Sequence, residues 1–431
     1  MTLLSRQYTE FPLAKRRQYQ LKFELILSEA ARLFNWQGSR ATTLAEVAAR
    51  LSLTKTCLYY YVDNKQDLIY KCYLSSCEML LDRANRAHKL SASGRDKIVS
   101  MIDGQITQYA ATLNGKGPHF AMLAEIYTLD EAQQKDVNLR WSEIFDVVSA
   151  MVREGIQDGT LQARNPKVIT LAIYSIIQWL PVWLNRSHIE SYENINDIIL
   201  DLIINGISSQ PVQLGAVSYS AVNYFRAEKQ QQNAEKRTAF YQVGSTYFNQ
   251  KGYKGTSLDE IAQTLSVTKG AFYYHIKSKE ELLYRCFIRT LDIEKQLLST
   301  ADNTGNSGLE KIEYALNLLV GVQFSNQGPL IRYRLLPSLD ETHRKMVLKE
   351  GKRNSARLGA FIEKGFNDGT LRLINAGIAQ NVLSGMIEAS ADLSGWFSFE
   401  DKDRLKCDYI DIFINGLNNK TNVNDRKYAD E

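Results

Sequence analysis

The chain has 431 residues, of which 44% are hydrophobic and 23% are charged, and a formal net charge of +4. This length is enough for two or three domains, and the composition is that of an ordinary globular protein, which argues against disordered and fibrous classes. The net charge is too small to indicate nucleic-acid binding by itself, and five cysteines without a C-x-x-C pair argue against a disulfide framework or a zinc site.

The basic residues concentrate at the N-terminal end. Residues 1–71 contain eleven Lys and Arg residues against six Asp and Glu residues. The cluster Lys15-Arg16-Arg17 could attract DNA phosphates, although such a cluster alone is more often a solvated tail. Because the first 17 residues lack the apolar core and cleavage site of a secretory signal, we expect a cytoplasmic protein with reduced thiols and neither metal nor cofactor.

The sequence up to residue 60 predicts three helices. Apolar residues recur at helical spacing over 23–34, and Gly38 ends that helix. Thr43 has the capping-box spacing to Glu46 and opens a second helix, and Thr54 caps a third, short helix, TKTCLYY. Two short helices about a turn apart form a helix-turn-helix, in which the second helix presents its first residues to DNA bases.

Long amphipathic stretches follow over about 75–206, and they predict a helical bundle. The segment 168–184 is nearly apolar enough to span a membrane, but Gln178 and Pro181 are costly in lipid, so we expect a packed helix and no membrane partner. Aromatic residues in this region predict either a ligand pocket or simply a core, and the pocket candidates are Tyr109, Tyr127, Trp141, Tyr174 and Trp179.

Residues 208–232 carry Ser, Gln, Pro and Gly without a helical period, which indicates a linker. A linker of about 25 residues could extend to roughly 80 Å at about 3.3 Å per residue. It would therefore reach from the end of one unit back to the level of its first helices.

The second half of the chain repeats the first. The segment TTLAEVAARLSLTKTCLYYYVDNKQDLIYKC from Thr42 matches TSLDEIAQTLSVTKGAFYYHIKSKEELLYRC from Thr256, at an offset of 214 residues. Later segments match at an offset of 210, such as GIQDGTL from Gly155 with GFNDGTL from Gly365. Because the match continues to the Asn-Gly pairs at 205 and 415, the repeat is a duplication of a whole unit.

These two segments resemble the DNA-binding signature of the TetR family of bacterial regulators, over about 50 residues in each copy. The resemblance implies that Thr43 and Ser257 meet phosphate, that 54–60 and 268–274 form recognition helices, and that Lys65 and Lys279 contact the DNA backbone. The expected DNA contacts are Thr43, Thr54, Lys55, Thr56, Tyr59, Tyr60, Tyr61 and Lys65 in the first copy, and Ser257, Thr268, Lys269, Gly270, Tyr273, Tyr274, His275 and Lys279 in the second.

Some of these positions carry alternatives or depart from the family pattern. Tyr59 and Tyr273 could equally pack inside their own units. Serine stands at 52 and 266, where the family usually has glycine in the turn, and Asp63 replaces the basic Lys277 of the second copy, which should weaken local attraction to phosphate.

The resemblance implies an all-α fold of two tandem units, each with a three-helix DNA-binding head and a helical bundle for ligand binding and dimerisation. We predict a first head at 18–70 and sensor at 71–207, the linker at 208–232, a second head at 233–284 and sensor at 285–418, and a flexible tail at 419–431. The segment AIYSIIQWLPVWL from Ala172 loosely resembles relatives that sense acyl-CoA, and the second copy differs there.

We therefore expect a ligand-responsive regulator, with repression the favoured mode, whose partners are an operator in double-stranded DNA and a small apolar effector. The heads could pair within one chain as a pseudo-dimer or between two chains as a homodimer. An enzyme is not expected, because the common catalytic motifs are absent from the sequence and the five histidines are scattered. A nonspecific architectural DNA-binding protein and a redox sensor acting through Cys57 are the alternatives.

Overall fold

A computed structural model describes residues 13–122, 126, 128–183, 195–214, 232–325, 327–392 and 402–419. Within these residues the secondary structure is helical, apart from two isolated β-bridges, Leu161 to Asn418 and Ser208 to Leu371. The predicted all-α fold of two tandem units is confirmed. No described helix is both long and apolar enough to cross a membrane.

The first unit is made of eight helices among its described residues. They are α1 (Leu13–Ala41), α2 (Leu44–Arg50), α3 (Lys55–Leu58), α4 (Lys65–His88), α5 (Gly94–Leu113), α6 (Glu131–Gln157), α7 (Pro166–Trp183) and α8 (Ile195–Asn205). The predicted break at Gly38 is present, because this residue has φ 77° inside the segment assigned to α1.

The second unit follows the same order. It contains α10 (Gln232–Gly255), α11 (Leu258–Thr264), α12 (Lys269–His275), α13 (Lys279–Thr304), α14 (Gly308–Phe324), η4 (Tyr333–Ser338), α15 (Glu341–Asn367), α16 (Ala376–Ala389), η5 (Ser390–Asp392) and α18 (Lys402–Asn415). Gly252 breaks α10 at φ 67°, as Gly38 breaks α1.

Each head is joined to its sensor by one continuous helix. The boundary that we predicted after residue 70 lies inside α4, and the boundary predicted after residue 284 lies inside α13. Cys72 and Cys286, one at the same point of each helix, are buried against the first helix of their own head. One helix is therefore shared between the head and the bundle of each unit.

The two units pack against each other through their last helices. Helix α7 packs on α16 and α18, and α8 packs on the same two helices. At the centre of this contact, a Cβ placed on Gly206 would lie 2.4 Å from the backbone nitrogen of Gly416, and one on Gly416 would lie 2.5 Å from that of Gly206. Only glycine allows the two chain segments to approach this closely.

Backbone hydrogen bonds across the contact occur in equivalent pairs. Ile207 donates to the carbonyl of Phe413, and Leu417 donates to that of Ile203, which are the same positions at an offset of 210. The same symmetry holds for a second pair, in which the Ser208 amide donates to the carbonyl of Ile414 and the Asn418 amide donates to that of Ile204. The interface therefore has the geometry of a two-fold dimer contact, although it lies within one chain.

Two ion pairs reinforce the interface with less symmetry. Arg164 bridges to Asp411 at 2.5 Å, and Arg372 bridges to Asp201 at 2.8 Å. The two aspartates are equivalent, but the two arginines are not. Each arginine also donates to a carbonyl of the paired glycines, Gly416 and Gly206 respectively.

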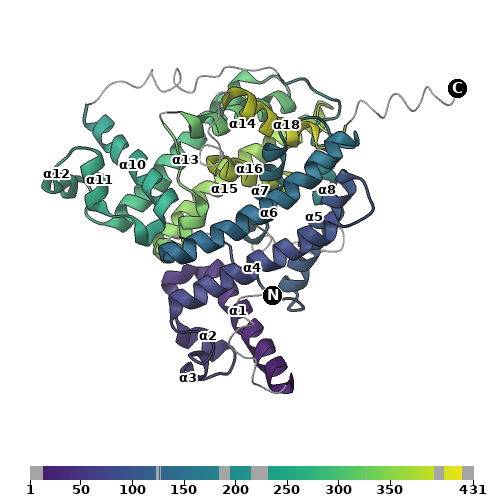
Figure 1. Ribbon diagram of the computed structural model, residues 1–431. Helices are drawn as coiled ribbons and strands as arrows, with labels where there is room; N and C mark the ends of the chain where they lie inside the picture. The colour runs from purple at the N-terminus through teal and green to yellow at the C-terminus, as the bar shows by residue number, and fades with distance from the viewer. Residues whose placement is uncertain are drawn as a thin grey trace.

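Figure 1 shows how the units are arranged. The first head projects at the bottom and the second head projects at the left, while α8 and α18 lie toward the opposite, upper right side. The helices α3 and α12 stand at the outer tips of their heads. Both tips are thus turned away from the helices that join the units.

The paired glycines give a direct test of the interface. Gly206→Ala should lower the free energy of unfolding by about 3 kcal/mol or more, because the new methyl group meets backbone atoms of the other unit. Gly369→Ala is the matched control: its φ of 73° is similar to the 69° of Gly206, but its surroundings are open. It should cost only about 1 kcal/mol in chemical denaturation. Equal costs would contradict the assigned contact.

Candidate DNA-binding heads and effector cavity

Thr54 caps the short helix α3 as the sequence predicted, and Thr268 caps α12 in the same way. The Thr54 side chain accepts a hydrogen bond from the Cys57 amide, and the Thr268 side chain accepts one from that of Ala271. The residues that open the two helices are exposed, and these are Thr54, Lys55 and Thr56 in the first head and Thr268, Lys269 and Gly270 in the second. These helix starts are open to an incoming ligand.

The turn before each short helix holds serine in a conformation that favours glycine. Ser52 has φ 55° and Ser266 has φ 53°. Their backbones therefore adopt the left-handed conformation that the family's usual glycine would supply. Such a conformation costs a non-glycine residue about 1 kcal/mol, and both heads keep it.

The tyrosines of the two segments divide between surface and core. Tyr60 is 58% exposed and Tyr274 is 82% exposed, while Tyr59 and Tyr273 are about half exposed. Tyr61 differs from our expectation of a DNA contact. Its ring is buried and stacks on that of Tyr19 with 4.6 Å between ring centroids, so it belongs to the core of the head.

His275 stands at the position equivalent to Tyr61 but is exposed. Its ring lies 5.1 Å from that of Tyr274 and 5.7 Å from that of Phe240, measured between centroids. At this equivalent position, the side chain is therefore exposed in the second head and buried in the first.

The capping box predicted at Thr43 is only partly formed, and its equivalent at Ser257 is absent. Thr43 accepts from the Glu46 amide, but the Glu46 carboxylate accepts from the Gln37 side chain instead of completing the box. Ser257 makes no side-chain cap, and Glu260 forms an ion pair with Lys251. In both heads the glutamate ties the second helix to the first helix, a long-range role that the local spacing does not reveal.

The predicted backbone-contacting lysines are partly buried. Lys279 donates to the carbonyl of Thr256 at 2.9 Å and lies over the Tyr253 ring, so it joins α13 to the end of α10. Lys65, which begins α4, is also partly buried. Lys269 is exposed but forms an ion pair with Asp259 at 2.6 Å, whereas Lys55 lies over the Tyr59 ring. The pairing of Lys269 was not evident from the sequence.

The first sensor fills most of the space that we expected to hold a ligand. Trp141 and Tyr174 lie 4.9 Å apart between centroids and line a cavity of only about 20 Å³. Tyr109 is buried against Phe120 rather than lining that cavity. Tyr127 lies outside the described residues. A cavity of this volume holds about one water molecule.

The larger cavity lies in the second sensor and measures about 480 Å³. It is lined by residues of α13, α14, η4, α15 and α16 and by two side chains from α7 of the first unit, Trp179 and Trp183, and it is partly open to solvent. Trp179, which we assigned to a pocket in its own sensor, therefore lines the cavity of the other unit. Its ring packs where Gly385 has no side chain, since a Cβ there would lie 2.5 Å from the ring.

Three substitutions between the copies explain the difference in volume. At an offset of 210, Trp141, Phe145 and Tyr174 of the first unit correspond to Gly351, Ser355 and Ser384, and all three small residues line the larger cavity. Replacing three aromatic rings by glycine and serine empties the space that they would fill. The duplicated bundle is thus a packed core in one unit and a cavity in the other.

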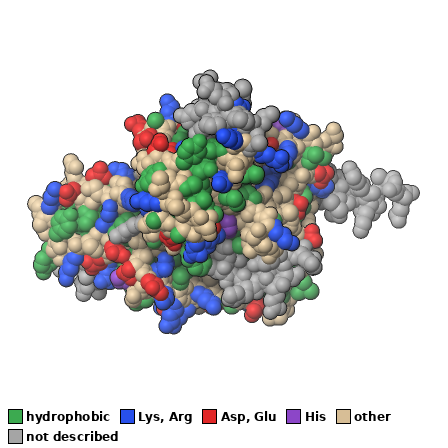
Figure 2. Space-filling view, turned by 90° about the horizontal axis from the view of Figure 1, so that it is seen from below, with side chains coloured by type: hydrophobic (Ala, Val, Ile, Leu, Met, Phe, Trp, Pro, Cys, Tyr) green, Lys and Arg blue, Asp and Glu red, His purple; other side chains and the backbone are tan. Residues whose placement is uncertain are grey.

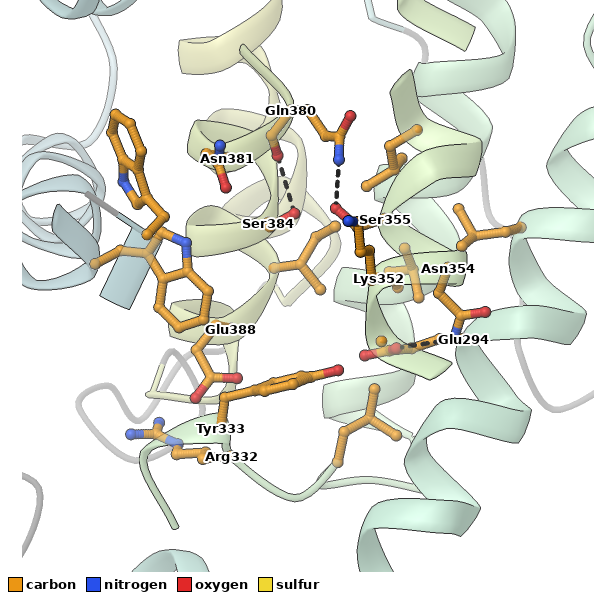
Figure 3. A pocket seen from close by; sticks show the side chains of 18 of the residues that line it. Glu294, Arg332, Tyr333, Lys352, Asn354, Ser355, Gln380, Asn381, Ser384 and Glu388 are labelled. Atoms are coloured by element: carbon orange, nitrogen blue, oxygen red, sulfur yellow. Dashed lines mark hydrogen bonds between the residues drawn. The ribbon is translucent and has the colours of Figure 1, made fainter. Parts of the chain in front are cut away.

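Polar groups in the cavity are partly satisfied by the protein. Figure 3 shows Gln380 donating to Ser355, and Ser384 donating to the Gln380 carbonyl, at 2.7 and 2.9 Å. The Asn354 side chain donates to Glu294 at 3.2 Å. The lining also contains two carboxylates, Glu294 and Glu388, and backbone amides of Tyr333 and Arg334 donate to Glu388.

Burial raises the pKa of both carboxyl groups. Desolvation raises the pKa of Glu294 to about 7, although a hydrogen bond from Asn354 acts to lower it. Desolvation likewise lifts the pKa of Glu388 to about 7, although Arg332 and Arg334 act to lower it. Both keep some accessible surface, and Figure 3 shows them on either side of the Tyr333 ring.

The described residues hold no cluster suited to a metal ion.

Comparison with known proteins identifies the heads. The family described as "Bacterial regulatory proteins, tetR family" matches residues 26–71 and again residues 242–286. The family described as "Tetracyclin repressor-like, C-terminal domain" matches residues 91–207. The chain belongs to the TetR family. It carries two TetR units in one polypeptide, which confirms the resemblance inferred from the sequence.

Individual relatives are more distant. The TetC protein of transposon Tn10 from Escherichia coli is 28% identical over 141 residues, which are 32% of this chain and 69% of TetC. The negative transcriptional regulator IcaR of the biofilm operon from Staphylococcus aureus is 30% identical over 67 residues, 16% of this chain and 36% of IcaR. The TetR-family regulator PfmR from Thermus thermophilus, 21% identical, covers 41% of this chain and 95% of its own, with a TM-score of 0.36.

The raised pKa of Glu294 predicts a pH-dependent cost to stability. The folded state keeps this carboxyl protonated to a higher pH than the unfolded state, so its burial becomes unfavourable as pH rises from about 4.5 through 7. Glu294→Gln removes the charge, and it should raise the free energy of unfolding at pH 8 by about 1–2 kcal/mol, with little effect at pH 5.

Thermal denaturation at both pH values provides the measurement. The control is Glu363→Gln, which removes an exposed carboxylate from α15 outside the cavity and should not stabilise the chain. A Glu294→Gln variant that is equally or less stable than the unmodified chain at pH 8 would show that the carboxylate is adequately solvated or paired.

Proposed function

We propose that this TetR-family chain is a ligand-responsive repressor that binds operator DNA through its two heads as an intrachain pseudo-dimer. The main support is that α3 and α12 both begin with exposed threonine and lysine side chains. The two units that carry these helices also pack against each other through a dimer-like interface. Repression is favoured because IcaR is a negative regulator. The domain boundaries predicted from the sequence are proposed with it, as is action in the cytoplasm.

Each head would insert its short helix into the major groove. Thr54 and Thr268, with Lys55 and Lys269, would meet phosphates or base edges at the helix start, and Tyr60 and Tyr274 would extend the contact. The family resemblance adds Thr43, Ser257, Lys65 and Lys279 near the backbone. Tyr61 is left out because its ring is buried.

The two heads differ enough to favour an operator with two unequal half-sites. The first head exposes Lys55 and Thr56, whereas the second exposes Lys269 and Gly270. Of the two lysines, Lys269 forms an ion pair with an aspartate, Asp259. On the face shown in Figure 2, Lys and Arg side chains are scattered among acidic ones and form no continuous basic patch. Such a surface favours recognition by specific contacts over attraction to any duplex.

The effector would bind in the cavity of the second sensor. The expectation of an acyl-CoA-like effector came from the sequence of α7, and in the fold α7 sends Trp179 and Trp183 into this cavity. Tyr333 also lines it and belongs to η4, which packs on α10 of the second head and on α1 of the first. A ligand that displaces η4 would therefore act on both heads, and one site would suffice for release.

The intrachain arrangement predicts the stoichiometry of the DNA complex. One 49.1 kDa chain should bind one operator, selected from a random DNA pool, and analytical ultracentrifugation would measure the mass of the complex. Exchanging the two half-sites for two copies of either one should weaken binding by at least about tenfold. Two chains per operator, or equal affinity for any duplex, would contradict the proposal.

Single lysine substitutions test the two heads separately. Lys55→Ala and Lys269→Ala should each weaken operator binding by about 5- to 100-fold, because each removes a DNA contact of about 1–3 kcal/mol. Lys89→Ala, an exposed lysine at the sensor end of α4, is the control and should change little. The measurement is a gel-shift titration at fixed salt. If only one substitution weakens binding, the other head does not contact the operator.

A further inference from the structure

The second-sensor cavity joins buried carboxylates with aromatic rings. Glu294 extends from α13 and Glu388 from α16, and Figure 3 shows both carboxylates directed to the cavity beside Tyr333. In the first unit the equivalent positions hold Leu80 and Gln178, neither of which is charged. The acidic groups are therefore a feature of the open cavity and are absent from its packed counterpart.

The charges around the two carboxylates are unequal. Arg332 and Arg334 lie near Glu388, and their positive charges partly offset the negative charge of its carboxylate. The interactions that act on Glu294 are the Asn354 hydrogen bond and repulsion from Glu388, with no cation among them. Lys352 also lines the cavity but is exposed to solvent. Arg332 lines the cavity too but acts on Glu388, so Glu294 is the carboxylate of the lining on which no cation acts.

Aromatic faces complete a site suited to a positive charge. Trp183 is buried, and Trp179 contacts Tyr333 edge to face with 6.4 Å between ring centroids. Aromatic faces attract organic cations, most strongly when water is excluded. Leucine and isoleucine side chains supply further apolar wall between the polar residues, which suits the apolar part of the same molecule.

We propose that this cavity binds an amphipathic organic cation, with its positive group beside Glu294 and its apolar groups against Trp179, Trp183 and Tyr333. One molecule would bind per chain, since the equivalent space of the first unit is filled by Trp141 and Tyr174. The inference rests on the proposed function only in naming this cavity as the effector site. An anion such as an acyl-CoA would meet repulsion at Glu294.

Two probes of nearly the same shape and opposite charge test the sign of the charge. Tetraphenylphosphonium and tetraphenylborate would be titrated separately into the full chain by calorimetry, with quenching of tryptophan fluorescence as the second readout. We expect the phosphonium to bind at one site, and the borate to bind at least about tenfold more weakly. Benzyltrimethylammonium, a smaller cation, would be titrated with its uncharged carbon isostere as a second pair.

Variants locate the site. Glu294→Gln should weaken phosphonium binding by about tenfold or more and leave borate binding unchanged or stronger. Asp292→Asn is the matched control, because it removes an exposed carboxylate two residues away, and it should change neither affinity. Ser384→Tyr introduces the residue of the first unit and should abolish binding by filling the cavity. Ser355→Phe is a second filling variant, and circular dichroism would establish that each variant folds.

The outcomes separate this inference from the proposed function. Equal or tighter borate binding, no binding of either cation, or unchanged phosphonium affinity in Glu294→Gln would each overturn the cation assignment, and gel-shift binding to the operator would be unaffected by that result. Conversely, loss of specific operator binding by the unmodified chain would overturn the proposed regulator, while selective binding of the cation would still stand. Titration with an acyl-CoA belongs to the same series, and tighter binding than the phosphonium would overturn the inference.

Discussion

The close approach of Gly206 and Gly416 is the constraint on which the molecule depends. The two segments cross with no side chain between them, so that backbone hydrogen bonds form in equivalent pairs on both sides and Arg164 and Arg372 can reach the carbonyls of the glycines. A contact of this kind ordinarily joins two separate subunits. Here both partners belong to one chain, which frees the two units to diverge without losing the interface.

The divergence is clearest in the two sensors. The first retains Trp141, Phe145 and Tyr174 and is packed almost without a void, whereas the second has Gly351, Ser355 and Ser384 and keeps a cavity of about 480 Å³. The first unit also lines the cavity of the second through Trp179 and Trp183, so the two bundles share one cavity wall.

Rigid elements connect the cavity with the heads. Helix α13 carries Glu294 on the cavity wall and continues without a break from the second head, and η4 carries Tyr333 while packing on the first helices of both heads. One wall of the cavity is thus in contact with both heads. The two short helices, α3 and α12, belong to one chain and differ in sequence.

The sequence by itself determined the duplication, the helix-turn-helix heads and the cap at Thr54, because these depend on local spacing and on hydrogen bonds between neighbouring residues. Only the tertiary structure decided that Tyr61 is buried, that Glu46 and Glu260 bind the first helix of their heads, and that Trp179 serves the cavity of the other unit. Each of these contacts joins residues distant along the chain. Their partners are fixed by how helices pack, which periodicity along one segment does not contain.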